Sequence, residues 1–440
     1  MLKITYLSNT KIIVMKNYLF LLLSTVICQL STAQNVGIGT TTPNSTALLH
    51  VDVGTSRTNG LLVTGTFYNP STVPDLGAGT RMMFYPGKAA FRAGSVDDFR
   101  STSWNNSNVG FLSSAMGYST IASGYASTAM GNYTTASGGN STAMGYNTTA
   151  NGGSSTAMGS NTTASATTST AMGNSTTASG FSSTAMGYST IASGYASTAM
   201  GYNTTASGIN STAMGNTTIA SGDNSFAAGA RVSTNGHAGA FFFGDGDPFN
   251  KGVRSIGFND QFAARFNGGY YFISSDVGAD IGVQVLAGGN AWVSMCDKNR
   301  KENFEPLNGD DILQKLKSIQ FSSWNYKTQN PKVHRHYGIM AQDFFHAFGS
   351  DKYGTIGNDT TVNPIDMIGI DMAAIQALEK RTAKLNEELK TQKARYAERL
   401  EKSENQIAEL TRQNEDLAKR LQQLEAFMLR QNKEITVIKN

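Results

Sequence analysis

Residues 127–140 read STAMGNYTTASGGN, and this 14-residue unit recurs nine times in strict register from about Phe111 to Gly229. Its Ala-Met-Gly core returns at the same spacing until the last copy, where Ala228 replaces methionine. The methionines of the series are Met116, Met130, Met144, Met158, Met172, Met186, Met200 and Met214. A fixed short period is typical of a solenoid, in which each copy forms one coil and buries its apolar residues by stacking on its neighbours.

The unit is too short for a helical hairpin and suits a coil of two short strands. We expect one strand in the Ala-Met-Gly half and one in the Thr-Ala-Ser-Gly half. Gly117, Gly124 and their equivalents are predicted to turn the chain where a positive φ is needed. At about 4.8 Å per coil, the nine coils would make a rod of roughly 40 Å.

Residues 111–222 contain no Asp, Glu, Lys, Arg or His, which argues against catalysis in the repeats. The polar residues and tyrosines at the variable positions form either a repetitive binding face or the solvated surface of a rod. These tyrosines include Tyr118, Tyr125, Tyr146, Tyr188, Tyr195 and Tyr202. We expect the methionines to fill the core rather than to form a metal or redox array.

The string Ser-Thr-Ala-Met-Gly followed by Ala-Ser-Gly resembles the head repeats of trimeric autotransporter adhesins of the YadA type, with Met in place of Ile. The resemblance implies a left-handed parallel β-roll, a homotrimer and attachment to a host surface, matrix or glycan. It covers the repeats and does not name a ligand.

The N-terminus predicts export. Met15-Lys16, an apolar run between Tyr18 and Ile27, and Ser31-Thr32-Ala33 together read as a secretory signal peptide. The apolar run is too short for a confident membrane span, so we expect no integral membrane segment in the mature chain. Loss of Cys28 with the signal would leave Cys296 as a single cysteine, which excludes an intrachain disulfide.

The composition and charge of the chain limit the fold class and the kinds of ligand that we expect. Of 440 residues, 46 are glycine and 15 % are charged, as in an extended β-architecture with several domains. The net charge of +4 with dispersed basic residues argues against nucleic-acid binding. Asp245-Gly246-Asp247 is either part of a calcium site or a turn, and we favour the turn. No metal and no cofactor is therefore expected.

Three strings after the repeats occur in a fixed order: Cys296 to Phe304, Trp324-Asn325-Tyr326-Lys327, and Arg335 to Phe344. Together they resemble the intramolecular chaperone domain of phage endosialidase tailspikes, the S74 peptidase family. That family trimerises, helps the preceding β-fibre to trimerise and then cuts itself off with a serine and a lysine five residues later. Lys301 matches the lysine, Cys296 stands in place of the serine, and His336 matches a histidine of the motif.

The resemblance leaves two interpretations of Cys296 and Lys301 open. A lysine base must be neutral, and a thiol needs less activation than a hydroxyl, so single-turnover autoproteolysis survives the replacement of serine by cysteine. Alternatively, the larger sulfur has ended cleavage and left a permanent trimerisation module. His336 either orients this site or satisfies a hydrogen bond in the core.

The C-terminal stretch predicts a coiled coil, because apolar or small residues alternate at spacings of three and four. A stutter separates Tyr396 from Ile407, and Asn414 occupies an a position that would set the register. The series is Ile375, Leu378, Thr382, Leu385, Leu389, Gln392, Tyr396, Ile407, Leu410, Asn414, Leu417, Leu421, Leu424, Met428, Gln431, Ile435 and Ile438.

The sequence thus predicts a mostly β chain with a long C-terminal helix, assembled as a homotrimer. Its segments are a signal peptide (1–33), a β-rich cap (34–110), the β-roll head (111–230), a β-rich neck (231–289), a chaperone-like α+β domain (290–374) and a coiled coil (375–438). The favoured function is a secreted or cell-surface adhesin-like fibre. The alternatives are a peptidase whose main activity is self-cleavage and a prophage tail fibre.

Overall fold

The computed structural model of the protein describes residues 16–18, 35–55, 60–68, 72–246, 252–275 and 281–437. The chain divides into two compact units, and each is described by itself. The first comprises residues 1–274 and 282–294, and the second comprises residues 275–281 and 295–440. Of the predicted signal peptide, only residues 16–18 lie within the described part of the chain.

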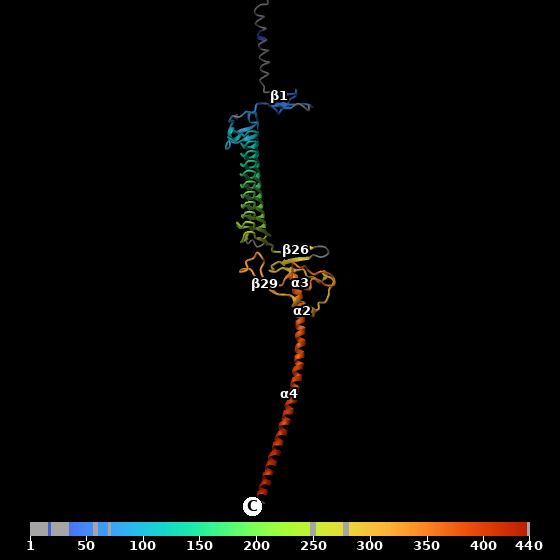
Figure 1. The fold of residues 1–440 in the computed structure, drawn as a ribbon. Helices are drawn as coiled ribbons and strands as arrows, with labels where there is room; N and C mark the ends of the chain where they lie inside the picture. The colour runs from blue at the N-terminus through green and yellow to red at the C-terminus, as the bar shows by residue number, and fades with distance from the viewer. Residues whose placement is uncertain are drawn as a thin grey trace, which may run out of the picture. The chain divides into compact units, whose positions relative to one another are not determined.

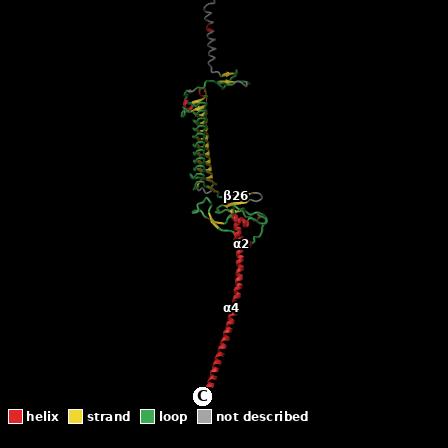
Figure 2. Ribbon diagram, viewed as in Figure 1, coloured by secondary structure: helices red, strands yellow, loops and turns green. Residues whose placement is uncertain are grey.

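A stack of parallel β-coils dominates the first unit (Figure 1 and, in yellow and green, Figure 2). Each repeated coil contributes one strand to a 13-stranded sheet and one to a 10-stranded sheet. Equivalent residues of successive coils lie opposite each other, as Met130 does to Met144 and Met144 to Met158. The predicted parallel β-roll is therefore confirmed.

The long sheet begins with an antiparallel pair, β3 and β4, and its later neighbours pair parallel. Its strands are β3 (Gly79–Tyr85), β4 (Ala90–Val96), β5 (Ser114–Tyr118), β7 (Thr128–Asn132), β9 (Thr142–Tyr146), β11 (Thr156–Ser160), β13 (Thr170–Asn174), β15 (Thr184–Tyr188), β17 (Thr198–Tyr202), β19 (Thr212–Asn216), β21 (Phe226–Ala230), β23 (Phe241–Gly244) and β25 (Phe262–Arg265). The short sheet consists of β6 (Ile121–Ala122), β8 (Thr135–Ala136), β10 (Thr149–Ala150), β12 (Thr163–Ala164), β14 (Thr177–Ala178), β16 (Ile191–Ala192), β18 (Thr205–Ala206), β20 (Ile219–Ala220), β22 (Val232–Ser233) and β24 (Arg254–Ser255).

The core of the roll is made of small side chains. Every seventh residue from Ala115 to Ala227 is an alanine with 0 % exposure. Two positions before each alanine stands a serine or threonine, and nearly all of these are fully buried, as are Ser127 and Thr134. The Ser127 hydroxyl donates to the carbonyl of Gly124 at 2.8 Å. Each 14-residue unit is therefore two similar halves of seven residues, one from each sheet, packed through their alanines.

The turns of the coil correct the expectation for the glycines. Gly117 has the expected positive φ of 118°, but Gly124 does not. A Cβ on Gly124 would lie 2.0 Å from the carbonyl oxygen of Gly138, so this glycine is needed for close approach of the next coil. The left-handed positions are instead the variable residues Ser119 and Ala126 and their equivalents, which recur every seven residues with φ near 50°.

The methionines lie on the outside of the long sheet, and the expectation that they fill the core is wrong for the single chain. Strand residues alternate between the two faces, so a buried Ala129 places Thr128 and Met130 outward. Met158 and Met214 are each 37 % exposed. The space between the two sheets, set by alanine contacts, has no room for a methionine side chain.

Two arginines satisfy backbone carbonyls at the two ends of the stack. Buried Arg92 donates to the carbonyls of Ser113 and Ala122 at 3.1 and 3.0 Å. Burial lowers the pKa of Arg92 to about 10, so the guanidinium remains charged at neutral pH. At the other end, Arg265 donates to the carbonyls of Ala230 and Asp245 at 2.9 and 2.8 Å. The carbonyls of Ser113 and Ala122 also accept from the backbone N–H groups of Phe91 and Gly110, so Arg92 adds a second donor to each of them.

The first unit also has small sheets outside the roll. β1 (Val36–Ile38) and β2 (Leu49–Val51) pair parallel. β26 (Gly269–Ser275), β27 (Ile281–Leu286) and β28 (Val293–Ser294) form a three-stranded sheet, although the ends at Ser275 and Ile281 fall in the second unit. Short 3₁₀ turns occur at Pro86–Lys88 and Asn106–Asn108.

The second unit is α+β. A 3₁₀ turn at Lys298–Arg300 precedes α2 (Gly309–Ser318), the antiparallel pair β29 (Ser322–Trp324) and β30 (His336–Gly338), α3 (Ala341–Phe348) and the long α4 (Pro364–Val437). Asn308 caps α2 by accepting from the backbone N–H of Asp310 and Asp311. The core brings together α2, α3 and the start of α4 through Ile312, Ile319, Phe344, Phe348 and Ala374.

Candidate functional site

The structure brings Cys296 and Lys301 together. The Lys301 Nζ donates a hydrogen bond to the Cys296 Sγ at 2.8 Å, and the cysteine is free and exposed. A lysine that contacts a thiol sulfur can exchange a proton with it, which is what a nucleophile and its base require. The distance between the two side chains therefore allows a proton to pass between them.

The 3₁₀ turn at Lys298–Arg300 creates this contact. Asp297 caps the turn by accepting from the N–H of Asn299 at 2.9 Å, and the N–H of Lys301 donates to the carbonyl of Lys298 at 3.1 Å. This turn lies between Cys296 and Lys301 in the sequence and reverses the chain, so that the two side chains come into contact. Asp297 also pairs with Arg300 at 3.9 Å, so a carboxylate accompanies the cations of this segment.

His336 is held elsewhere in the same unit. Its ring stacks on Trp324 with a centroid distance of 4.6 Å, and its Nε2 lies 3.0 Å from the Gln329 Oε1. Trp324 and His336 are direct neighbours across the β29–β30 pair. Among the described residues, no hydrogen bond links His336 to Cys296 or Lys301. The contacts of His336 with Trp324 and Gln329 therefore lie within the β29–β30 hairpin and the turn that joins its strands.

Asp245 makes internal contacts in the first unit. Its carboxylate lies 3.6 Å from the Arg265 Nε, and its other oxygen accepts from the N–H of Asn267 at 2.6 Å. Asp247, the second carboxylate of the motif, lies outside the described residues. Within the described ranges, no group of three or more His, Cys, Asp or Glu side chains gathers as a metal site would require.

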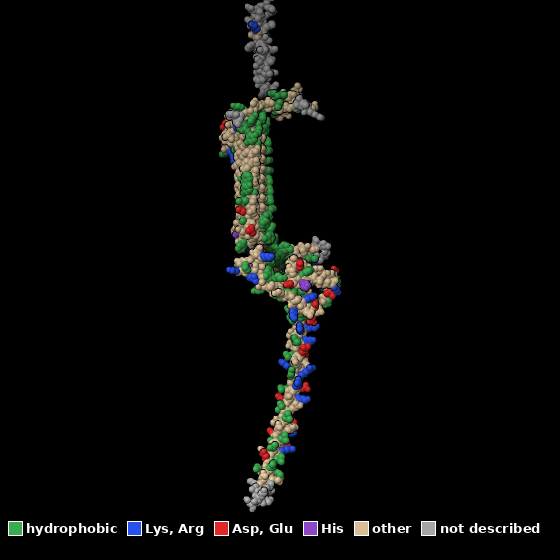
Figure 3. Space-filling view, in the orientation of Figure 1, with side chains coloured by type: hydrophobic (Ala, Val, Ile, Leu, Met, Phe, Trp, Pro, Cys, Tyr) green, Lys and Arg blue, Asp and Glu red, His purple; other side chains and the backbone are tan. Residues whose placement is uncertain are grey.

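The outer face of the long sheet is a second candidate site, for protein contact. We call it the methionine face. It consists of eight methionines that pair in register from β5 to β19, and of the threonines that stand two positions before them in β7 to β19. The methionines are Met116, Met130, Met144, Met158, Met172, Met186, Met200 and Met214. Figure 3 shows, in green, hydrophobic side chains running along the stack of coils. A regular, uncharged apolar strip of this length is typical of an interaction surface.

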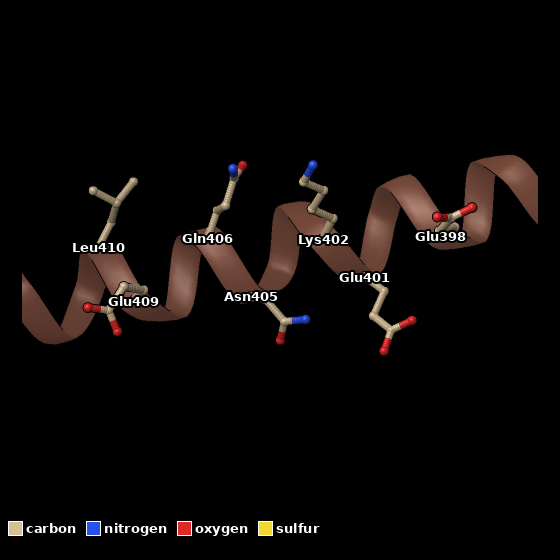
Figure 4. A pocket seen from close by; sticks show the side chains of 7 residues that line it. All are labelled: Glu398, Glu401, Lys402, Asn405, Gln406, Glu409 and Leu410. Carbon is tan, nitrogen blue, oxygen red and sulfur yellow. The ribbon is translucent and has the colours of Figure 1, made fainter.

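Helix α4 also exposes apolar side chains. Leu385, Leu417 and Leu421 are exposed by 56, 59 and 60 % in the single chain. Near the predicted stutter, Lys402, Gln406 and Leu410 project from the same side of the helix (Figure 4). Across the described residues, no helix is both long enough and apolar enough to cross a membrane, because α4 carries charges throughout.

Comparison with known families matches two segments of the chain. Residues 110–134, 136–162, 150–176, 178–204 and 206–231 match the family model of the YadA head domain repeat. Residues 296–350 match the family described as the chaperone of endosialidase, Peptidase_S74. No curated protein matches the chain. The chain therefore joins adhesin-type head repeats to an endosialidase-type chaperone domain, and repeats of this kind indicate a surface-exposed or secreted protein.

The sequence analysis missed two features of the β-roll, namely the arginines near its ends and its seven-residue half-repeat. Arg92 and Arg265 donate to carbonyls near the ends of the stack, but they are not the charged residues next to the uncharged stretch 111–222, since Arg100 and Asp223 lie closer to it. The seven-residue half-repeat was visible as the recurrence of alanine and glycine, but the 14-residue identity of the copies hides it.

Proposed function

We propose that this protein is an adhesin-like fibre that assembles as a homotrimer and is exported by its N-terminal signal peptide. The observation that carries the proposal is the methionine face, because an uncharged apolar strip on a rod needs a partner of the same length and period. Other copies of the same chain have both. The endosialidase-type domain and the exposed leucines of α4 support the same assembly.

In this proposal the C-terminal chaperone domain and a coiled coil of α4 align three chains, and the β-roll then packs by its methionine face. Each coil adds one methionine per chain to the shared core. At about 25 cal/mol for each Å² of apolar surface buried, even partial burial repeated over eight coils gives a large total. Because the coils are nearly identical, the methionine face does not define the register between chains, so the C-terminal domain has to set it first.

Met158→Asp tests the methionine face. In a lone chain the new carboxylate would be solvated and the thermal midpoint of the β-roll would stay the same. Buried between copies, an unpaired carboxylate costs several kcal/mol, so the midpoint should fall by many degrees. Ser154→Asp is the matched control, since Ser154 is exposed at a turn of the same coil. Equal midpoints for the two variants would contradict packing by this face.

A second function, self-cleavage, is favoured by the 2.8 Å contact between Lys301 Nζ and Cys296 Sγ. The thiol would transfer its proton to a neutral Lys301 amine and attack the carbonyl carbon of a neighbouring peptide bond, forming a thioester as the amine leaves with a proton. Water would then hydrolyse the thioester and regenerate the thiol. His336 is left out of this scheme because it contacts Trp324 and Gln329.

Intact mass of the purified full chain decides on cleavage. The wild-type chain is expected to break at or next to residue 296, and Cys296→Ala and Lys301→Ala should both stay whole. An unbroken wild-type chain would contradict self-cleavage and would mean that the chaperone domain stays attached as a permanent trimerisation module. A break that persists in both variants would point to another protease.

Attachment is tested with the whole chain on a panel of host cells, matrix proteins and glycans. We expect binding through the exposed aromatic and polar edges of the roll. Those edges include Tyr188 and Tyr202, whose stacked rings have a centroid distance of 5.1 Å. Absence of binding across the panel would leave the β-roll as a spacer.

A further inference from the structure

An aromatic cavity of about 540 Å³ lies in the first unit, beside the last strands of the long sheet. Its walls come from β23, β25 and the three-stranded sheet. We call it the aromatic socket, defined by Phe243, Phe262, Phe266, Tyr270, Phe272 and Trp292. The rings contact one another in two groups, Phe243 with Phe262 at a centroid distance of 6.0 Å, and the other four in a series that includes Phe272–Trp292 at 5.4 Å.

The socket lacks a wall. Phe262, Phe272 and Trp292 line it, and yet 68, 55 and 59 % of their surfaces are exposed. No charged side chain lines it, and its polar side chains are Asn290 and Tyr270. The Tyr270 hydroxyl already donates to the carbonyl of Ala264. A small-molecule site encloses its ligand and orients it with several polar groups, so the socket suits an apolar protein surface better.

The socket continues the methionine face. In the long sheet Met214 lies opposite Ala228, Ala228 opposite Phe243, and Phe243 opposite Ala264. The neighbouring outward column changes from threonine to phenylalanine, running from Thr212 through Phe226 and Phe241 to Phe262. A partner that covers the methionine face along its length therefore reaches the socket without a break.

We propose that the aromatic socket is closed by the socket residues of a neighbouring copy of this chain, and that this contact locks the C-terminal base of the β-roll. The inference rests on the proposed trimer. In a trimer, residues that line the threefold axis meet the same residues of the other copies, so a face that packs at this axis brings the exposed rings of the three chains together. Interlocking rings also oppose the sliding by one coil that a uniform methionine column permits, because the socket occurs once per chain.

Photocrosslinking tests the socket. The photoreactive residue p-benzoylphenylalanine is placed at Phe262 in the full chain carrying Cys296→Ala, and light and heavy isotope-labelled chains are assembled together. We expect peptides that join a light chain to a heavy chain, with the partner site inside residues 241–293. The same probe at Tyr195, an exposed aromatic at an edge of the roll, is the matched control and should give no such peptides.

The outcomes separate this inference from the function on which it rests. If sedimentation shows a trimer and a probe at Met158 joins copies while the probe at Phe262 reacts only within its own chain, the socket proposal is overturned and the trimer stands. If the chain sediments as a monomer, the proposed assembly fails and the socket proposal fails with it. Joined light and heavy peptides at Phe262 alone would support the socket and remove the methionine face from the interface.

Discussion

At the scale of single residues, the β-roll depends on glycines that no other residue can replace. Gly145 has a φ of 121°, and a Cβ there would lie 2.0 Å from the carbonyl oxygen of Gly159 in the next coil. The same pair of constraints recurs in every coil, because each glycine of this column faces the next. The spacing between coils is thus fixed by backbone contact rather than by side chains.

Gly145→Ala should therefore destabilise the roll. Backbone strain at this φ alone costs about 1–3 kcal/mol, and displacement of the next coil adds to it. The thermal midpoint, followed by circular dichroism at one heating rate, should fall by several degrees. Gly139→Ala in the neighbouring turn is the control, since its Cβ would meet no atom within 4 Å and its φ is not positive. Similar midpoints for the two variants would refute the argument.

A pH-dependent contact joins the roll to the loop before it. The Tyr133 hydroxyl donates to the Asp97 carboxylate, and this hydrogen bond holds the pKa of Asp97 below its usual 3.8. The same bond, with desolvation and the charge of Asp97, raises the pKa of Tyr133 to about 12. The Asp97 contribution to stability is present above pH 3.8 and lost as pH falls through its lowered pKa. The Tyr133 contribution is present below pH 10.0 and lost as pH rises through about 12.

Tyr133→Phe removes this contact. Wild type should exceed the variant in thermal midpoint between pH 3.8 and 10.0, and the difference should shrink outside that window in both directions. The measurement is a pH series of midpoints for both proteins. A difference that stays constant down to strongly acidic pH would show that the ring, and not the hydrogen bond, is responsible.

At the scale of elements, the repeat predicted the strands and their pairing but not which apolar side chain points inward. Ala129 and Met130 are adjacent and both apolar, so periodicity allows either to face the core. The choice depends on the distance between the two sheets, which is a property of the folded coil. In the same way, the spacing of Cys296 and Lys301 was predicted by resemblance and their contact is present, whereas His336 is held by Trp324 through the β29–β30 pairing.

Helix α4 is expected to pack against the same helix of other copies through its heptad residues. Leu421 belongs to the heptad series and is 60 % exposed in the single chain. Leu421→Glu should dissociate the assembly at concentrations where the matched variant Gln423→Glu stays intact, because a carboxylate buried in a helical interface costs several kcal/mol. Sedimentation velocity over a dilution series measures this. Equal dissociation of the two variants would mean that Leu421 does not lie between helices.

At the scale of the whole molecule, the proposed assembly gives the two units different roles. The β-roll has a uniform face that any shift by one coil would satisfy almost as well. The second unit has a hydrophobic core of its own and a helix whose apolar residues need partners. In the proposed trimer, the C-terminal unit would set the number and alignment of chains that the repetitive head leaves undefined. We therefore expect the full chain to form a trimer through both units.

Sedimentation equilibrium of the full chain carrying Cys296→Ala tests the proposed trimer most directly, because the substitution removes the nucleophile of the proposed cleavage. The account predicts a single species with three times the 46.9 kDa mass of one chain, unchanged on dilution until the whole assembly dissociates. A species with the mass of one chain would contradict the account, because it would leave both the methionine face and the leucines of α4 without partners.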